Sequence, residues 1–283
     1  MHTPVLPNET IEELRLKKVG VYIDATAGEG GHLIPIAKSG AQVIAIDRDK
    51  NQIDSLRSQA TSFSNIIWTT GNFAEIEIIA KKNNIKLVDG VLFDLGLSMG
   101  QISSSKKGFS YQNKDEKLDM RLSDGEGETA SDVLNRSSEE ELYDIFAAFS
   151  EELNSLGIAS SIYRTRLKKK FSTVQDLTDA IDRGVVPGTR VIITNVYARI
   201  FQALRIAVNS EFVNLKKGLV GASKILKKGG RLVIITFHSI EDRIVKSFIQ
   251  ADESLKEIKK ISGRKYGSHA FERSALLRVA EKI

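Results

Sequence analysis

Residues 21–47 decide the fold of this chain: segment 21–32 reads VYIDATAGEGGH, and segment 43–47 reads VIAID. The pattern predicts an apolar strand at about 19–24, a glycine-rich turn, a helix, and a second apolar strand that ends in Asp47. This order is the first half of a nucleoside-binding α/β sheet.

The details of the turn favour one cofactor over others. Glycines at 28, 30 and 31 lack a Cβ and let the backbone approach a ligand, and Asp47 lies about 20 residues further on, where an acid hydrogen-bonds ribose hydroxyls. A dinucleotide fingerprint needs a third glycine where this chain has Leu33, and no P-loop motif is present. Asp24 would repel a pyrophosphate and attract a cation. We therefore favour S-adenosylmethionine, a cationic cofactor without phosphate, over NAD, with a plain tight turn as the alternative.

The composition sets broad limits. The 283 residues carry 41 Lys+Arg against 36 Asp+Glu, a net charge of +5, which permits an anionic partner such as nucleic acid. No apolar run approaches the roughly 18 residues of a membrane span, and the N-terminus has no signal-peptide pattern. We expect a cytoplasmic protein with no membrane partner.

The chain contains no cysteine, so mechanisms that use a cysteine nucleophile are excluded. Methylation at C5 of a pyrimidine ordinarily needs a thiolate. If the chain methylates a base, a ring or exocyclic nitrogen is therefore the expected acceptor.

The order of elements predicts an α/β fold. Strands at about 19–24, 43–47, 66–70 and 88–95 alternate with helices, as in a doubly wound parallel sheet. A late strand at 231–237, a helix capped by Ser239, and an antiparallel ribbon from 257–261 and 274–280 complete the sheet.

The sheet pattern is interrupted after Gly96. A polar loop is expected over 103–128 and helices over 129–183, with helix starts at Ser138 and Thr173. A further helical region covers about 195–227. We therefore predict a sheet domain made of 1–102 and 193–283, with an inserted helical domain at 103–192.

Acids lie where the predicted strands end. Asp24, Asp47 and Asp94 each end a strand, and such ends meet at the ligand-binding edge of an open α/β sheet. Asp94 could also be a structural turn acid. Phe73, just after the third strand, faces an adenine ring or lies in the core. His238 ends the late strand and either handles a base or is structural.

Three other segments could contact RNA. Residues 107–111 and 118–121 combine aromatic, cationic and acidic side chains suited to gripping an unstacked base, or they form a solvated loop. The cationic run 164–170, with Arg199 and Arg205, could form an RNA-backbone footprint or a solvated face.

Segments across the whole chain resemble one family, the bacterial 16S ribosomal RNA (cytosine-N4)-methyltransferases RsmH (MraW). The matching stretches, in family order, are HTPVL (2–6), GGH (30–32), IDRD (46–49), DGVLFDLG (89–96), GFS (108–110), LDMR (118–121), FQALRI (201–206), FHSIEDRIVK (237–246) and RSA (273–275). The chain departs from the family at 98–101, 107, 149–152 and 195–199, and its segment before the final Arg-Ser is short.

The resemblance implies a Rossmann-like class I methyltransferase sheet with an inserted all-helical domain that receives RNA. It implies that S-adenosylmethionine is contacted by Gly30, Gly31, His32, Asp47, Phe73, Asp94 and Gln101, with His32 acting through its backbone. The implied substrate is a cytosine in the decoding centre of 16S ribosomal RNA in the small ribosomal subunit.

We predict methyl transfer to the exocyclic amine of that cytosine, with no metal. Asp94 is the candidate to accept a hydrogen bond from the amine, with binding of the cofactor alone as the alternative. Asp119, Arg121 and His238 are the candidates to handle the base. A second copy of the chain, forming a homodimer, is kept open as a partner. The alternatives are a methyltransferase of another RNA or of a protein, a noncatalytic ribosome-assembly factor, and an NAD dehydrogenase.

Overall fold

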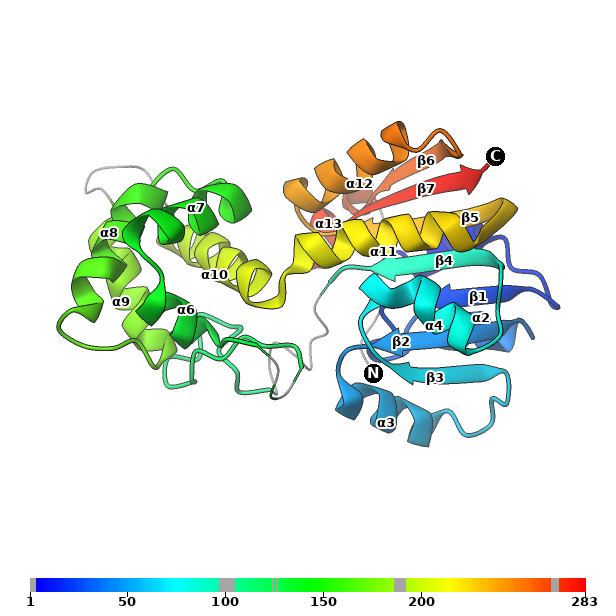
Figure 1. Cartoon of the computed structure of the whole chain (residues 1–283), viewed down its shortest axis with the longest axis horizontal. Helices are drawn as coiled ribbons and strands as arrows, with labels where there is room; N and C mark the ends of the chain where they lie inside the picture. The colour runs from blue at the N-terminus through cyan, green and yellow to red at the C-terminus, as the bar shows by residue number, and fades with distance from the viewer. Residues whose placement is uncertain (1–3, 97–104, 124, 126, 186–191, 266–269) are drawn as a thin grey trace. The chain divides into compact units, whose positions relative to one another are not determined.

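The computed structural model describes residues 4–96, 105–123, 125, 127–185, 192–265 and 270–283. The chain divides into two compact units. The first, the sheet unit, consists of Met1–Ser98 and Phe212–Ile283, and the second, the helical unit, is Met99–Glu211. Figure 1 shows the sheet unit in blue, cyan, and yellow to red, and the helical unit mostly in green.

Within the described residues, the strands of the sheet unit form one seven-stranded sheet in the order β3-β2-β1-β4-β5-β7-β6. The strands from β3 to β5 pair in parallel, and β7 runs antiparallel to both β5 and β6. The predicted doubly wound α/β sheet is thus confirmed, as is the antiparallel ribbon at its edge. The strands are β1 (Val21–Asp24), β2 (Gln42–Asp47), β3 (Ile66–Thr70), β4 (Val88–Asp94), β5 (Leu226–Thr236), β6 (Leu255–Ser262) and β7 (Leu276–Lys282).

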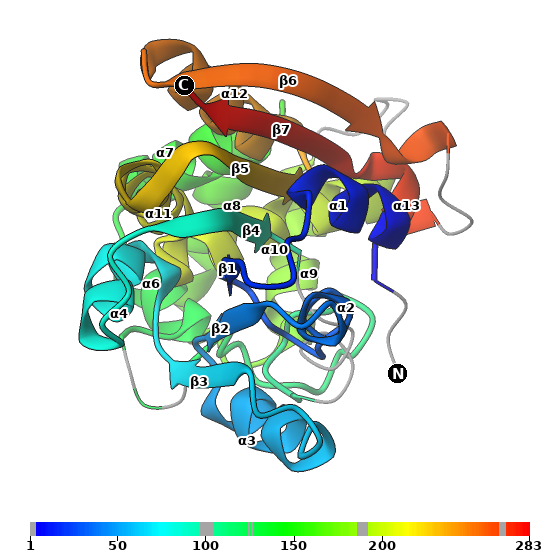
Figure 2. The same ribbon diagram turned by 90° about the vertical axis from the view of Figure 1, so that its right-hand side faces the viewer.

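Helices cover both faces of this sheet (Figure 2). Side chains alternate between the two faces: in β2, Val43 and Ala45 are buried with one set of helices, and Ile44 and Ile46 with the other. One set is α1 (Pro7–Leu14), α2 (Leu33–Lys38) and α3 (Lys50–Gln59). The other is α4 (Ile76–Lys82), α11 (Glu211–Ile225) and α12 (Ser239–Ala251). Short helices are η1 (Phe73–Glu75), η2 (Gly263–Lys265) and α13 (Ala270–Ser274).

The helical unit has a hydrophobic core of its own. Its helices are α6 (Ala130–Arg136), α7 (Glu139–Ser150), α8 (Ser155–Arg166), α9 (Val174–Gly184) and α10 (Ile193–Asn209). Ser138 and Thr173 cap α7 and α9 in complete capping boxes, as their sequences predict. No helix in the described ranges is long and apolar enough to span a membrane.

The observed boundary between the units differs from the predicted one at its C-terminal side. We predicted that the helical domain ends at residue 192, but α10 packs inside the helical unit, where Val196, Ile200 and Leu204 are buried. The predicted helical region 195–227 is two helices, because Ser210 adopts a left-handed backbone with φ +50°. An apolar stripe shows that a helix is buried but does not show against which partner.

Two glycines allow α8 and α9 to approach at backbone distance. A Cβ on Gly184 would lie 2.5 Å from the Cα of Ile158, and a Cβ on Gly157 would collide with the carbonyl oxygen of Gly184. Ser161 Oγ also donates to the carbonyl of Ala180 at 2.7 Å. The crossing of the two helices therefore depends on the absence of side chains at both positions.

Gly184→Ala should destabilise the protein by about 1–3 kcal/mol, because a methyl group must displace backbone rather than a flexible side chain. Thermal denaturation followed by circular dichroism measures this. The control is Gln175→Ala, an exposed position on the same helix, which should change stability by less than about 0.5 kcal/mol. Equal effects of the two substitutions would contradict the tight crossing.

Candidate functional site

The central strands bring three carboxylates to one edge of the sheet. In the parallel register Asp24 of β1 pairs with Ala45 of β2 and with Leu92 of β4, so Asp47 and Asp94 lie two residues further along on either side. The predicted convergence of the strand ends is confirmed. Parallel strands present such ends to ligands.

The glycine-rich turn is anchored to this edge. The N–H of Gly28 donates to Asp47 Oδ2 at 2.8 Å, and the N–H of Ala27 donates to the carbonyl of Ile46. Gly28 and Gly30 have positive φ, +48° and +83°, which favours glycine at both positions.

At Gly30 and Gly31 the reason for glycine differs from the one we predicted. A Cβ on Gly30 would lie 2.6 Å from Leu56, and a Cβ on Gly31 would lie 2.7 Å from Pro4, so protein packing excludes side chains there. At Gly28 the nearest atom to an added Cβ is the carbonyl oxygen of Thr26, at 3.8 Å. Gly28 is therefore the glycine whose backbone is open to a ligand. Direct cofactor contacts by Gly30 and Gly31 stay predictions.

Asp47 keeps acceptor capacity for a ligand. Its Oδ2 accepts from Gly28 and its Oδ1 accepts from the N–H of Asp49 at 2.9 Å. Burial raises the pKa of Asp47, and the hydrogen bonds from Asp49 and Gly28 oppose that rise. Each carboxylate oxygen has a second lone-pair direction, which suits the ribose hydroxyls predicted for this position.

Asp24 and His32, which are buried, form a polar cluster beside the turn with Asp94, which is partly exposed. His32 is 5% exposed, and its Nε2 lies 3.6 Å from Asp94 Oδ2. Burial raises the pKa of Asp24 from 3.8 to about 7, and the charges of Asp94 and Asp47 add to the rise. A positive charge on His32 and the hydrogen bond from the N–H of Thr26 lower it. We predicted that His32 acts through its backbone; the structure shows that its side chain also belongs to the site.

Asp94 has an unused acceptor. Its backbone N–H donates to Thr26 Oγ1 at 2.7 Å, which fixes the end of β4 against the turn. Its Oδ1 is buried and has no hydrogen-bond partner among the described residues. Since buried acceptors are normally satisfied, this oxygen and the acidic edge fit a ligand that brings N–H groups or positive charge. Thr26 was not among the predicted residues, and only its position in the turn could have indicated it.

A separate cavity of about 870 Å³ lies between α2 and α3. It borders Gly28–Gly31 and the side chains of Ile34, Leu56 and Phe63, but Asp24, Asp47 and Asp94 do not line it. The carboxylate edge and this cavity therefore both adjoin the glycine-rich turn but have different side chains.

His238 caps a helix. Its Nδ1 accepts from the N–H of Glu241 at 3.4 Å, and its Nε2 lies 3.0 Å from Glu241 Oε1. The prediction that Ser239 caps this helix is wrong. Ser239 is the first helical residue, and the cap is His238, whose ring nitrogen takes the place of the usual side-chain oxygen. These contacts agree with the structural alternative for His238, and its handling of cytosine stays a prediction.

Phe73 packs as a core residue does. Its ring meets Phe93 edge to face at a centroid distance of 5.5 Å, and it fills the space that a Cβ on Gly218 of α11 would need. This packing favours the core alternative over stacking on adenine. Gln101, the remaining predicted cofactor contact, lies outside the described residues.

In the helical unit, Asp119 and Arg121 pair with each other. The guanidinium donates to both carboxylate oxygens at 2.8 Å, and this pairing lowers the pKa of Asp119. Between them Met120 is buried with φ +58°, and its carbonyl accepts from Asn209 Nδ2 at 2.8 Å. The segment is thus a fixed turn that presents an ion pair. Asp119 and Arg121 belong to the helical unit, whereas Asp94 and His238 belong to the sheet unit. The geometry of each pair is therefore described within its own unit.

Some predicted RNA-binding side chains have structural partners. Phe109 and Tyr111 pack against the helical core. Arg199 forms a salt bridge with Glu152, and Arg205 forms a bidentate salt bridge with Glu211. These four residues therefore have structural roles that sequence alone did not reveal.

The raised pKa of Asp24 predicts a pH-dependent stability. Between about pH 4 and pH 7 the folded protein holds a proton on Asp24 that the unfolded chain has released. The contribution of this proton to the free energy of unfolding is therefore full below pH 4 and is lost as the pH rises through 7. Asp24→Asn should remove that loss. Its stability relative to wild type should rise from pH 5 to pH 8, by up to about 1.4 kcal/mol per pH unit. Urea denaturation of both proteins across this range measures the difference, and a flat difference curve would contradict the assignment.

Comparisons with known proteins identify the family of this chain. The model of the MraW methylase family matches residues 1–265. The ribosomal RNA small subunit methyltransferase H of Carboxydothermus hydrogenoformans is 43% identical over 255 residues, which cover 89% of this chain and 81% of that protein. The protein of the same name from Thermosipho melanesiensis is 39% identical over 288 residues, covering 100% of this chain and 98% of that protein.

These matches confirm the resemblance noted in the sequence. They extend over the whole chain, and the glycine turn, the acidic strand ends and the late strand all lie within the matched residues. The chain is accordingly a methyltransferase that uses S-adenosylmethionine, and it belongs to the MraW methylase family.

Proposed function

We propose that this enzyme transfers the methyl group of S-adenosylmethionine to the exocyclic N4 of a cytosine in the decoding centre of 16S ribosomal RNA. The observation that carries the proposal is the unpartnered, buried Oδ1 of Asp94 at an acidic sheet edge. The names of the relatives, ribosomal RNA small subunit methyltransferases H, support the substrate class.

The amino-acid composition supports nitrogen as the acceptor. The chain has no cysteine, so it cannot form the thiolate adduct that carbon methylation of a pyrimidine ordinarily uses. An amine needs no covalent activation by the enzyme, because its lone pair can attack the methyl carbon directly. The enzyme's task is then to hold the two reactants in line.

The sheet unit has groups suited to each part of this task. Bound S-adenosylmethionine supplies a methyl group on a cationic sulfur. Asp47 suits the ribose hydroxyls, and the open backbone at Gly28 allows close approach. Asp24 and His32 are buried beside the same edge, and burial raises the pKa of Asp24.

Asp94 is proposed to act on the attacking amine. The N4 lone pair of cytosine is delocalised into the ring, so the amine is a weak nucleophile. A carboxylate oxygen that accepts one amine N–H favours the pyramidal nitrogen and stabilises its developing positive charge. The N4–methyl bond forms as the sulfur–methyl bond breaks and its electron pair stays on sulfur, which leaves S-adenosylhomocysteine. The methylated nitrogen then releases one proton to solvent.

We propose that the helical unit receives the RNA strand. The turn with Asp119 and Arg121 presents a fixed carboxylate and a guanidinium, a pair able to hydrogen-bond a base taken out of its stack. The proposed partner is the small ribosomal subunit, which places the enzyme in the cytoplasm. A homodimer stays a prediction.

Mapping the methyl group tests the function. Small subunits that lack the modification are incubated with the purified enzyme and labelled S-adenosylmethionine, and the 16S RNA is fragmented and analysed by mass spectrometry. Wild type should add one methyl group to a decoding-centre cytosine. Asp94→Asn should lower kcat/KM by about 10²–10³-fold while the protein stays folded, because the amide is a weaker acceptor for the developing charge.

The matched control is Asp54→Asn, an exposed acid on α3 of the same unit, which should keep full activity. Transfer to protein or to another RNA would contradict the proposed substrate. Equal activity of wild type and Asp94→Asn would contradict the role of Asp94, and absence of transfer by wild type would contradict the function itself.

A further inference from the structure

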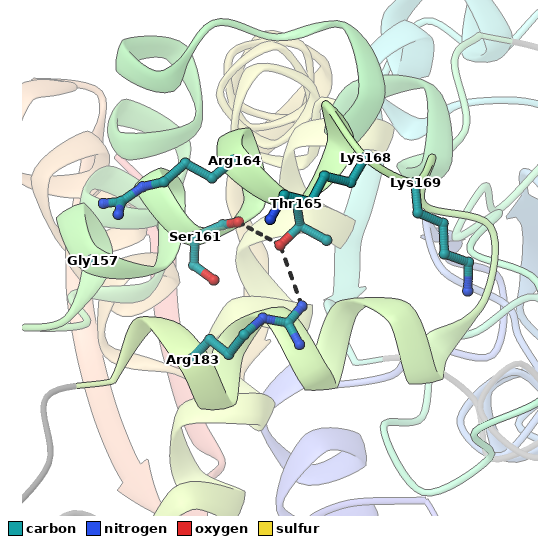
Figure 3. A pocket seen from close by; sticks show the side chains of 7 residues that line it. All are labelled: Gly157, Ser161, Arg164, Thr165, Lys168, Lys169 and Arg183. Atoms are coloured by element: carbon teal, nitrogen blue, oxygen red, sulfur yellow. Dashed lines mark hydrogen bonds between the residues drawn. The ribbon is translucent and has the colours of Figure 1, made fainter.

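A basic pocket of about 390 Å³ lies between α8 and α9 in the helical unit (Figure 3). It includes part of the cationic run noted in the sequence. Its lining residues are Gly157, Ser161, Arg164, Thr165, Lys168, Lys169 and Arg183.

The helix crossing builds the pocket. Gly157 and Gly184 bring the two backbones together, so side chains from both helices meet over a short distance. Arg183 reaches from α9 to Thr165 on α8 and donates to its Oγ1 at 3.3 Å (Figure 3). Thr165 in turn donates to the carbonyl of Ser161 at 2.7 Å. The floor of the pocket is therefore polar and already hydrogen-bonded.

The charge of this pocket is largely uncompensated. Among the described residues, no carboxylate lies within ion-pair distance of Arg164, Lys168 or Arg183, and Arg164 donates only to the hydroxyl of Ser160. Lys169 is different, since it pairs with Asp176 at 2.6 Å. Three cations thus line one cavity with no carboxylate partner in the part of the chain that the structure describes.

Other cations of the same run lie outside the pocket. Arg166 donates to the carbonyls of Leu134 and Ser137, which ties α8 to the end of α6. Lys170 is exposed and does not line the pocket. The structure therefore separates the run into a structural arginine, a solvated lysine, and residues that converge on the pocket.

We propose that this pocket binds a phosphate group of the RNA backbone, an inference that rests on the proposed RNA substrate. Two guanidinium groups offer directed N–H donors to phosphate oxygens, and Lys168 adds a point charge. Phosphate contacts of this kind position a strand without reading its sequence. The pocket would hold the strand while other residues select the base.

The test measures RNA binding by the full-length enzyme. A labelled single-stranded fragment of 16S RNA is titrated at salt concentrations from about 50 to 200 mM. The double variant Lys168→Gln/Arg183→Gln should weaken binding roughly 10-fold and reduce the slope of log affinity against log salt by about 0.7–1 for each phosphate group that the variant no longer neutralises. Lys170→Gln, the matched control from the same run, should change affinity less than about 2-fold.

Two further measurements keep the result interpretable. Melting temperature and S-adenosylmethionine affinity should be unchanged in Lys168→Gln alone, whose side chain has no hydrogen bond among the described residues. Inorganic phosphate should compete with RNA in wild type and lose that ability in the double variant. If phosphate binds the pocket while the double variant keeps wild-type RNA affinity, the pocket is a free-anion site and the proposal is wrong.

Other outcomes separate this inference from the proposed function. If Lys170→Gln weakens RNA binding as much as the pocket variant, the charge acts diffusely and the pocket is not a site. If the variants bind RNA as wild type does while wild type methylates 16S RNA, the inference fails and the function stands. If the pocket variants lose RNA affinity but wild type transfers no methyl group, RNA binding stands and the function fails.

Discussion

The parallel register of β1 with its two neighbours is the constraint on which the site depends. Because Asp24 pairs with Ala45 on one side and Leu92 on the other, each neighbouring strand extends two residues further and ends in its own carboxylate. The turn that leaves β1 must then pass between Asp47 and Asp94, and hydrogen bonds hold it to both: Gly28 donates to Asp47, and Thr26 accepts from the N–H of Asp94. A shift of one residue would turn these side chains to the other face of the sheet.

Three carboxylates at one edge of the sheet are electrostatically unfavourable, and this favours a ligand that carries positive charge. Burial raises the pKa values of Asp24 and Asp47, and Asp94 keeps a buried oxygen without a partner among the described residues. Backbone N–H groups and His32 offset part of this cost. A cationic methyl donor would offset more, whereas a pyrophosphate would increase it. The acidity that destabilises this edge therefore supports the proposal that the edge faces S-adenosylmethionine.

The helical unit uses its cations in two ways. Arg199 and Arg205 have carboxylate partners, and Arg166 satisfies carbonyl groups at a helix end. Such groups stabilise the fold and have little charge left for a ligand. Where α8 and α9 cross on glycine, Lys168 and Arg183 instead face a cavity. Backbone packing thus decides which members of a basic sequence remain available to an anionic partner.

The sequence by itself determined the strands, the acids at their ends, and the capped starts of α7 and α9, because periodicity and capping act between residues a few positions apart. It also restricted the chemistry, since a chain without cysteine has no thiolate. Only the tertiary structure decided that α10 packs in the helical unit, that Leu56 and Pro4 exclude side chains at Gly30 and Gly31, and that His238 caps α12. It likewise decided which basic residues are paired. These outcomes depend on residues far apart in the chain, whose contacts no local pattern specifies.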